Sequence, residues 1–358
     1  MSVDLARQVL TDAIASRVFP AATTEVGAGG RVIWREPLGT LTFDEASAPA
    51  TVNTPFDLAS LTKIIATTTV AMQLVAEGRL ALDDQVASFF AEWRGADRES
   101  VAARDLLEHA SGLSARLIDA PPQQSREFAH DICTMPLEYA PRTRSVYSDL
   151  GFILLGFALA DRGGAPLESQ FEAVRSRLSA VESALGSEPL TFRLDVQARR
   201  RAAPTVPADD DIRRGRSLAG EVHDNYAAAL GGIAGHAGLF GTVAAVGAFA
   251  RAVLRGARGD SSVPAPLSPA LVARAVTKSS VPGNSRALGW DTMLPTSSCG
   301  GRMSASAFGH VGFTGTSLWI DPARDRYFVL LTNRACGGGT LDQMRAVRRA
   351  FHDALGEV

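Results

Sequence analysis

The two ends of the chain carry apolar spacings that predict helices and strands. Residues 3–16 repeat apolar positions with a helical period. Residues 21–26 and 31–38 flank the turn sequence Gly27-Ala28-Gly29-Gly30 and predict a β-hairpin. Near the C-terminus, further apolar runs predict four strands and a closing helix: residues 287–293, 306–310, 317–320, 327–332 and 341–355.

The N-terminal hairpin predicts the overall architecture. A two-stranded hairpin alone is only marginally stable in water, so it needs the C-terminal strands to complete a sheet. We therefore expect an α/β plus all-α fold, in which an antiparallel sheet built from both termini carries flanking helices. Residues 60–255 are mostly helical patterns and Gly/Pro loops, which predicts a helical region inserted between the two halves of the sheet.

This pattern predicts two interlocked domains. One is a sheet domain formed by residues 1–58 and 241–358, and the other is a mostly helical domain formed by residues 59–240. Residues 203–225 are the most loop-like part of the helical domain. An active site is expected at the seam between the two domains.

Composition predicts a globular protein that does not bind nucleic acid. The chain is 46% hydrophobic and 21% charged, with a net charge of -2. A pI near 6.3 gives no sign of a basic binding surface. The basic run 199–201 is followed by the acidic run 209–211, which indicates a solvated loop.

The cysteines and the hydropathy of the chain bear on disulfide bonds, zinc binding, membrane insertion and cellular location. Cys133, Cys299 and Cys336 are odd in number and lack metal-ligand spacing, which argues against a disulfide framework and a zinc site. The N-terminus has no basic region leading into an apolar run, and no stretch approaches 18 apolar residues. We expect a cytoplasmic protein without membrane insertion, or a periplasmic or secreted one if a signal peptide was removed. The sequence predicts no oligomeric state.

Lys63 is one of only two lysines in the chain, which contains 34 arginines. Lysine is the cation whose pKa burial can lower toward neutrality, and Lys63 follows Ser60 by three positions on one helix face. Residues 60–77 have helical spacing, which places Ser60 near free N–H groups and the positive end of the helix dipole. The pair indicates a nucleophile and its proton acceptor. The alternative is an N-cap serine with a solvated lysine.

A second cluster centres on Tyr147 and Asp149, just ahead of an apolar helix that begins near residue 150. Residues two apart in an extended backbone point their side chains the same way. A tyrosine beside a lysine ammonium can have its phenolate favoured and act as a base. The alternative is a tyrosine that packs its ring in a loop, with Ser148 or Asp149 as an N-cap.

A third cluster spans residues 308–322, where glycines interrupt a strand pattern. Such glycines mark the close approach of another backbone or of a ligand. If this segment lies next to Ser60, the backbone N–H of Phe313 could be a second oxyanion donor beside that of Ser60. His310, in the same segment, could equally be a core or surface histidine.

The three clusters, in this order and spacing, resemble the serine β-lactamase and penicillin-binding-protein superfamily. The closest resemblance is to its class C β-lactamase-like branch, which includes D-alanyl-D-alanine carboxypeptidases and family VIII carboxylesterases. The family's Ser-x-x-Lys, Tyr-x-Asn and His-x-Gly motifs fall on residues 60–63, 147–149 and 310–312. The resemblance covers about residues 15 to 355 and implies the same split fold. Similar accessory stretches are residues 105–113, 220–224 and 235–240.

The resemblance implies acyl transfer through a covalent intermediate. Ser60 attacks the substrate carbonyl, and Lys63 with Tyr147 takes the serine proton and passes one to the leaving group. The backbone N–H groups of Ser60 and Phe313 hold the oxyanion, and water then hydrolyses the acyl-enzyme. Either Lys63 or Tyr147 can be the base, because the two would titrate together. No metal or organic cofactor is needed.

Two departures from the family pattern bear on the substrate. Asp149 stands where the family most often has asparagine, and a carboxylate has no N–H with which to bond a substrate amide carbonyl. Asp149 would instead hold Lys63 charged, which favours Tyr147 as the base. Val311 replaces a hydroxyl residue that helps the peptidases and β-lactamases to bind a substrate carboxylate. A protonated His310 would restore part of that binding.

These departures favour neutral carboxylic esters as substrates, so we expect a carboxylesterase of the β-lactamase-like type. Asp149, His310, Val311 and Gly312 are the expected binding or supporting residues. The alternatives are a D-alanyl-D-alanine carboxypeptidase or a β-lactamase, and a catalytically silent binding protein on the same fold.

Two further features have expected roles outside the chemistry. Residues 114–140 and 280–305 are expected to form loops that set the acyl-chain preference. His109, His223 and His236 lie in the accessory stretches, and we expect them to make structural hydrogen bonds.

Overall fold

The computed structural model describes residues 2–117, 122, 124–209 and 211–356. Residue 210 of the acidic run and residues 118–121 and 123 of the predicted 114–140 loop lie outside the described residues. The strands are β1 (Ala21–Ala28), β2 (Arg31–Gly39), β3 (Phe56–Asp57), β4 (Leu190–Thr191), β5 (Phe240–Gly241), β6 (Asp291–Thr292), β7 (Phe308–Val311), β8 (Ser317–Asp321) and β9 (Arg326–Thr332).

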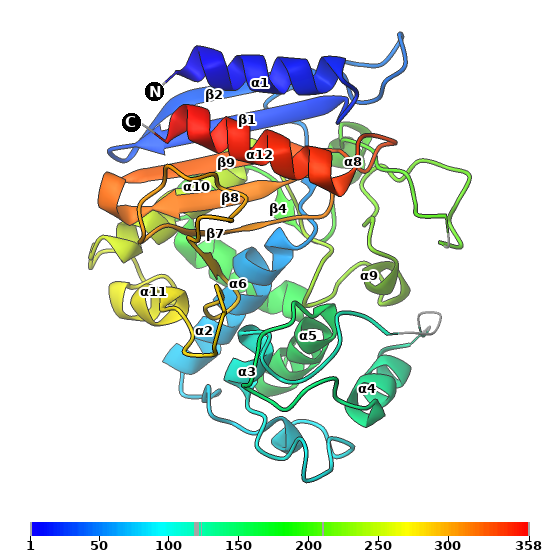
Figure 1. Ribbon diagram of the computed structural model, residues 1–358, viewed down its shortest axis with the longest axis vertical. Coiled ribbons are helices and arrows are strands. Elements are labelled where there is room, and N and C mark those ends of the chain that lie inside the picture. The colour runs from blue at the N-terminus through cyan, green and yellow to red at the C-terminus, as the bar shows by residue number, and fades with distance from the viewer. Residues whose placement is uncertain (1, 118–121, 123, 210, 357–358) are drawn as a thin grey trace.

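The helices follow the same order along the chain (Figure 1). They are α1 (Val3–Ala15), the π-helix η1 (Lys63–Thr67), α2 (Thr68–Ala76), η2 (Val86–Ser88), α3 (Ala103–Leu107), α4 (Ser125–Thr134), α5 (Asp149–Gly163), α6 (Leu167–Leu178), α7 (Ala184–Ser187), α8 (Val196–Arg200), α9 (Asn225–Ala229), α10 (Val243–Ala257), α11 (Pro269–Val276), η3 (Pro322–Arg324) and α12 (Leu341–Leu355).

The main sheet is built from both ends of the chain, as the hairpin argument predicts. Its six strands lie in the order β2-β1-β9-β8-β7-β6, and each neighbouring pair is antiparallel. The N-terminal hairpin joins the C-terminal strands through β1 and β9, where Glu25 pairs with Val329. The expected α/β plus all-α fold is therefore confirmed.

The sheet separates two apolar layers, because successive side chains of a strand point to opposite faces. On β9, Phe328 and Leu330 join the core under α1 and α12, whereas Val329 and Leu331 join the larger core with α10. Figure 1 shows α1 and α12 side by side on one face of the sheet. The larger core continues into α2, α5 and α6, which form the helical region.

The predicted strand over residues 287–293 is wrong in extent, since only Asp291–Thr292 forms β6. The Ala287 N–H donates to the Trp290 carbonyl (2.8 Å), which closes a turn. Gly289 sits in this turn with a φ of +77°, a conformation that glycine adopts without strain. Ala287, Leu288 and Trp290 are buried in the turn. The apolar pattern therefore reflects burial of a turn and not a strand.

The helix predicted over residues 60–77 is present but irregular. Its first part is the π-helix Lys63–Thr67, in which the Thr68 N–H donates to the Lys63 carbonyl, five residues back. Single π turns occur frequently at functional sites. The π segment presents Thr67 Oγ1 to the Gly235 carbonyl (2.6 Å), so the start of this helix is bonded to the 235–236 backbone.

A short second sheet, β3-β5-β4, holds the segment that leads into this helix. Asp57 pairs with Phe240, and the Leu58 N–H donates to the Leu239 carbonyl (2.9 Å). These pairings fix residues 56–58 beside residues 239–241. The domain boundaries expected at 58/59 and 240/241 remain predictions that fall at this small sheet.

Within the described residues, no single helix is long and apolar enough to cross a bilayer. The helices Asp149–Gly163 and Leu167–Leu178, which are bent relative to each other, reach that length and apolarity only together.

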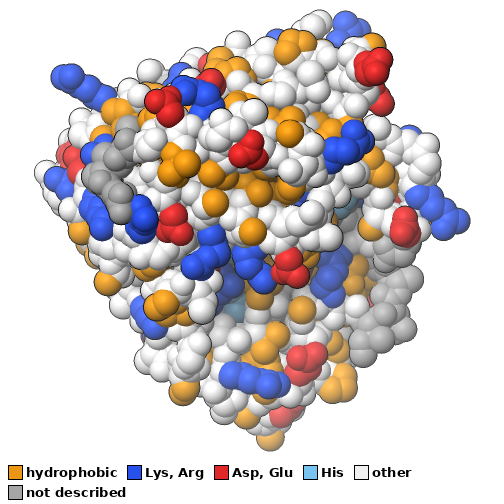
Figure 2. All heavy atoms as spheres, turned by 45° about the horizontal axis from the view of Figure 1, so that its top comes forward, with side chains coloured by type: hydrophobic (Ala, Val, Ile, Leu, Met, Phe, Trp, Pro, Cys, Tyr) orange, Lys and Arg blue, Asp and Glu red, His pale blue; other side chains and the backbone are white. Residues whose placement is uncertain are grey.

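Cys133, Cys299 and Cys336 are buried free thiols. The face in Figure 2 carries Lys and Arg side chains interleaved with Asp and Glu.

Candidate active site

Ser60 follows a constrained segment at the end of β3. The Asp57 carboxylate accepts hydrogen bonds from the backbone N–H of Ala59 (2.8 Å) and of His223 (2.6 Å). Ala59 has a φ of +47°, which a residue with a Cβ adopts only when its surroundings impose it. The N–H groups of residues 61–63 donate to the carbonyls of residues 58–60. Among the described residues, no group accepts from the Ser60 N–H, which leaves it available to a ligand.

Lys63 is fully buried, and its ammonium meets three acceptors. Lys63 Nζ donates to Ser60 Oγ (3.0 Å), to Asp149 Oδ1 (2.8 Å) and to the His236 carbonyl (3.0 Å). Contacts with three oxygen acceptors fit the ammonium form, which has three N–H groups. Burial lowers the pKa of Lys63, but Asp149 and Tyr147 outweigh burial and raise the pKa above its ordinary value. Lys63 is therefore a fixed cation beside Ser60.

Tyr147 reaches Ser60 from the loop ahead of α5. Its hydroxyl donates to Ser60 Oγ (2.7 Å), and Lys63 Nζ lies 4.9 Å from the centre of its ring. Ser148 caps α5 by accepting from the Gly151 N–H (3.3 Å), which fixes the turn that carries Tyr147. Tyr147 and Asp149 thus point into one site, as their spacing predicts.

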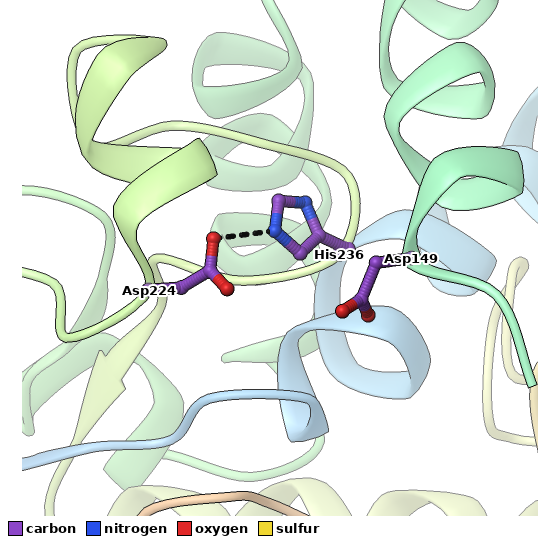
Figure 3. A group of neighbouring side chains, drawn as sticks. All are labelled: Asp149, Asp224 and His236. Carbon is purple, nitrogen blue, oxygen red and sulfur yellow. Dashed lines mark hydrogen bonds and ion pairs between the residues drawn. The ribbon is translucent and has the colours of Figure 1, made fainter. Parts of the chain in front are cut away.

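Asp149 links Lys63 to a second cation that the sequence did not reveal. Asp149 Oδ2 lies 3.2 Å from Arg116 Nη1, which also contacts Asp224 Oδ2 at 2.9 Å. Asp224 Oδ1 in turn contacts His236 Nε2 at 2.7 Å, as the dashed line in Figure 3 marks. Burial raises the pKa of Asp224, but His236 and Arg116 hold it well below its usual range. Opposite charges therefore alternate along this wall of the site.

Asp149, Asp224 and His236 also form a group with the composition of a metal site (Figure 3). Their ligand atoms lie within 4.8 Å of one another. However, Lys63 and Arg116 already bond the carboxylate oxygens that would face a metal ion. Two cations inside the ligand set repel a third, so the group fits an ion-pair network better than a metal centre.

The third cluster lies against the segment that carries Ser60. Thr314 Oγ1 donates to the Asp57 carbonyl (2.7 Å), and Thr316 Oγ1 donates to the Leu58 carbonyl (3.0 Å). A Cβ on Gly312 would lie 2.6 Å from the Leu58 carbonyl oxygen, so glycine permits this approach. Phe313 follows in the turn and is 49% exposed. Among the described residues, no group accepts from its N–H, as an oxyanion donor requires.

His310 and Val311 precede this turn on β7. The His310 ring is buried with its centre 5.9 Å from that of Tyr147, and its Nδ1 lies 2.8 Å from the Val311 carbonyl. Burial, Arg286 and Lys63 lower the pKa of His310 well below its usual value. The expectation that a protonated His310 supplies a donor for a substrate carboxylate stays a prediction, and this lowered pKa argues against it.

Arg286 provides a cation where His310 does not. Its guanidinium carbon lies 5.2 Å from the centre of the Tyr147 ring, on the turn before β6. Its side chain is 21% exposed, and its ion pair with Asp291 is long at 3.9 Å. The positive charge of Arg286 is thus accessible beside the candidate base.

The rings of His109 and His236 make the structural hydrogen bonds that we expect, whereas Nδ1 of the His223 ring has no partner among the described residues. His109 Nδ1 accepts from the Ser148 N–H (3.0 Å), and its ring centre lies 4.6 Å from that of Tyr147. His236 contacts Asp224 and accepts from Lys63 through its carbonyl. The His223 ring stacks on Phe313 at 5.4 Å, and its backbone N–H donates to Asp57.

The sequence missed Arg116, Asp224 and Arg286 as members of the site. Asp224 lies in the accessory stretch 220–224, whose sequence indicates no chemistry. No sequence signal pointed to Arg116, because it lies 33 positions from Asp149 and meets it only in the folded chain. Arg286 directly precedes the predicted strand over residues 287–293, and nothing in its neighbours along the chain marks it as a site residue.

Comparison with known proteins identifies the family. The beta-lactamase family model matches residues 6–351. The chain belongs to the beta-lactamase family. This serine hydrolase family accounts for the order of the three clusters and for the sheet built from both termini.

Relatives within this family differ in the activities that their names state. The chain is 30% identical to the "Putative D-alanyl-D-alanine carboxypeptidase" of Escherichia coli K12, over 81% of the chain and 71% of that protein. It is 29% identical to the "N-acetylmuramyl-L-alanine amidase" of Bacillus subtilis strain 168, over 88% of the chain and 77% of that protein.

Solved structures share the fold at lower identity. The hydrolase EstCE1, described as having promiscuous acyltransferase activity, superposes with a TM-score of 0.75 at 20% identity, over 98% of both chains. A class C beta lactamase from Rhodobacter sphaeroides superposes with a TM-score of 0.76 at 19% identity, over 99% of both chains. These likenesses support the beta-lactamase-like architecture.

Proposed function

We propose that the protein hydrolyses acyl compounds through a covalent intermediate on Ser60. The observation that carries this proposal is that Ser60 Oγ contacts both the Tyr147 hydroxyl (2.7 Å) and the Lys63 ammonium (3.0 Å). A nucleophile within hydrogen-bond distance of a base, with the base oriented by a third group, is the arrangement that activates a serine.

In this proposal Tyr147 is the base and Lys63 remains an ammonium. In the resting structure the Tyr147 hydroxyl donates to Ser60 Oγ. Once Tyr147 has lost this proton to solvent, its phenolate accepts the Ser60 proton as Oγ bonds to the substrate carbonyl carbon. Tyr147 then passes this proton to the leaving group as the carbonyl re-forms, and a water molecule hydrolyses the acyl-enzyme by the reverse transfers. The three bonds donated by Lys63 support this assignment, because they leave it no lone pair with which to accept a proton.

The backbone N–H groups of Ser60 and Phe313 would stabilise the oxyanion. Both lie at the junction between the turn after β7 and the start of the helix that contains Lys63. Preorganised backbone donors of this kind usually supply a large share of the rate enhancement in acyl transfer.

We favour neutral carboxylic esters as the substrate class. Both Asp149 oxygens accept bonds from cations, so position 149 offers no side-chain amide to a peptide substrate. Val311 offers no hydroxyl, and neutral His310 offers no charge to a substrate carboxylate. An ester with an uncharged acyl group needs none of these donors.

A second candidate substrate class is the D-alanyl peptide. Arg286 favours it, because a guanidinium beside Tyr147 could bind a terminal carboxylate by paired hydrogen bonds. The names of the Escherichia coli and Bacillus subtilis relatives, a putative carboxypeptidase and an amidase, agree with hydrolysis of an amide bond.

One substrate panel tests the proposal and separates these classes. p-Nitrophenyl butyrate, a D-Ala-D-Ala peptide and nitrocefin would be compared on one preparation, with Ser60→Ala as the control. We expect the ester to have the largest kcat/KM, and Ser60→Ala to lose about a thousandfold or more of the turnover. A larger kcat/KM on the peptide would favour the D-alanyl peptide as substrate, with Arg286 binding its terminal carboxylate. Unchanged turnover by Ser60→Ala would contradict the nucleophile, and no turnover of any compound by the native chain would favour a silent binding protein.

A further inference from the structure

Arg348 is a buried cation without an acidic partner. It lies on α12 with 6% of its surface exposed, and Nη2 donates to the carbonyls of Gly312 (2.6 Å) and Thr316 (2.9 Å). Within the described part of the chain, no carboxylate forms an ion pair with it. Removing an unpaired charge from water is costly, so a buried guanidinium that bonds only carbonyls needs an explanation.

The charge of Arg348 persists at neutral pH. Burial, together with Arg334 and Arg345, lowers the pKa of Arg348 to about 9. This value still leaves the guanidinium protonated near pH 7. The protein therefore maintains a fixed positive charge directly beneath the turn that follows β7.

The Gly312 carbonyl belongs to the same peptide unit as the Phe313 N–H. In a planar trans peptide, the C=O and N–H bonds point in opposite directions. Arg348 bonds the carbonyl side of this unit, so the N–H side faces away from α12. The turn packs on its other side against residues 57–59, which directly precede Ser60.

A second arginine holds the next peptide unit. Arg334 is 8% exposed and donates to the Phe313 carbonyl through Nε (3.1 Å) and Nη2 (2.7 Å). Its guanidinium carbon also lies 4.6 Å from the centre of the Phe313 ring. Both peptide planes that meet at the Phe313 Cα are thus fixed by cations.

We propose that Arg348 is a positioning residue of the oxyanion hole: it orients and polarises the Gly312–Phe313 peptide so that the Phe313 N–H becomes a stronger donor to the reacting carbonyl oxygen. A charge-assisted bond to a peptide carbonyl strengthens the bond that the N–H of the same peptide donates, because hydrogen bonds in a chain polarise one another. The inference rests on the proposed acyl-enzyme at Ser60.

The test compares Arg348→Met with Arg345→Met. Arg345 lies on the same helix, is exposed and pairs with Asp342, so its variant removes an equal charge without touching the turn. We expect Arg348→Met to lower kcat on p-nitrophenyl butyrate about tenfold to a hundredfold with little change in KM, because an oxyanion donor is weakened. Arg345→Met should retain kcat.

A spectroscopic signal distinguishes polarisation from a general structural effect. The infrared stretch of the acyl-enzyme ester carbonyl moves to lower frequency when oxyanion donors strengthen. We expect Arg348→Met to move it toward the frequency of a free ester, and Arg348→Lys, which keeps the charge, to move it less. If Arg348→Met does not fold, the Arg348→Lys shift decides. The proposal would be overturned if the carbonyl stretching frequency is unchanged in the variant that folds. It would also be overturned if the variant raises KM and leaves kcat unchanged.

Mass spectrometry separates this inference from the proposed function. The native chain and each variant would be quenched during turnover, and the peptide containing Ser60 would be analysed for the added acyl group. Absence of the adduct in the native chain contradicts the proposed function itself. An adduct with an unshifted carbonyl stretch contradicts only the role of Arg348.

Discussion

At the scale of single residues, the charge state of Lys63 decides how the site works. A lysine behind a serine in an arginine-rich chain first suggests a base with a lowered pKa. The structure instead surrounds Lys63 Nζ with three acceptors, of which Asp149 is the anionic one. In the proposed mechanism the role of base then falls to Tyr147, whose hydroxyl contacts Ser60 Oγ beside the Lys63 ammonium.

Replacing Asp149 by asparagine should expose this division of roles. Asp149 raises the pKa of Lys63, so its loss lets Lys63 lose a proton at lower pH. We expect Asp149→Asn to lower kcat/KM about tenfold and to move the alkaline limb of the pH–rate profile to lower pH. The measurement is kcat/KM on p-nitrophenyl butyrate between about pH 6 and pH 11, a range that includes the ordinary pKa of a lysine side chain.

Asp161→Asn is the matched control for this change, because Asp161 lies exposed at the other end of α5. Its profile should follow that of the native chain. If Asp149→Asn lowers the rate while its alkaline limb stays in place, Lys63 would not be the group that Asp149 holds charged.

At the scale of elements, the site depends on how closely the turn after β7 approaches the segment before Ser60. Thr314 and Thr316 bond the carbonyls of Asp57 and Leu58, and the absent side chain of Gly312 permits the contact. The sequence indicated close approach at these glycines. It could not name the partner, because residues 57–59 are more than 250 positions away along the chain.

Gly312→Ala tests this approach. The new Cβ would lie 2.1 Å from Thr316 Oγ1 and 2.6 Å from the Leu58 carbonyl oxygen, so the turn must move away from Ser60. We expect the free energy of unfolding to fall by about 1–3 kcal/mol, as for other overpacked sites. We also expect kcat to fall at least about tenfold, since an oxyanion donor moves with the turn.

Gly301→Ala is a suitable control, because a Cβ at Gly301 would meet no atom within 4 Å. Urea denaturation and kcat on p-nitrophenyl butyrate would be measured for both variants. Native kcat in a folded Gly312→Ala variant would show that the approach of this turn does not set the oxyanion donor.

At the scale of the whole molecule, joining the two termini in one sheet brings β7 and α12 to the start of the helix that contains Lys63. The same compact core buries several histidines in their neutral form. Burial lowers the pKa of His109, His223 and His310, and it lowers that of His352 to about 3. Domain boundaries and the cytoplasmic location remain predictions from the sequence.

These histidines predict that acid destabilises the protein. Below about pH 6.5 the unfolded chain binds protons that the folded histidines do not, so the free energy of unfolding falls as pH falls. Asp57 opposes this trend, because burial raises its pKa to about 6 and its folded form holds more protons. The histidines outnumber it, so we expect a net loss of stability between pH 7 and pH 5.

Between pH 7 and pH 5, His352→Gln should reduce the fall in the free energy of unfolding by about 2 kcal/mol. This is the contribution of one histidine that stays neutral in the folded protein over that pH range. Glutamine retains a polar group near Ser317, which lies 3.1 Å from His352 Nε2. The measurement is urea denaturation at the two pH values, with His130→Gln as an exposed control. If the free energy of unfolding falls equally in the native and His352→Gln proteins, His352 is not a source of the acid sensitivity.

The sequence by itself determined most elements at the two ends of the chain and the chemical class of the site. Local periodicity predicted α1, the hairpin, β7 to β9 and α12, and motif spacing selected Ser60, Lys63, Tyr147 and Asp149. Only the tertiary structure decided which distant groups surround them: Arg116, Arg286 and Arg348 reach the site from three separate segments. The physical reason is that periodicity and spacing report contacts between neighbours in sequence. The charge state of a buried group depends instead on every residue that the fold brings within a few ångströms.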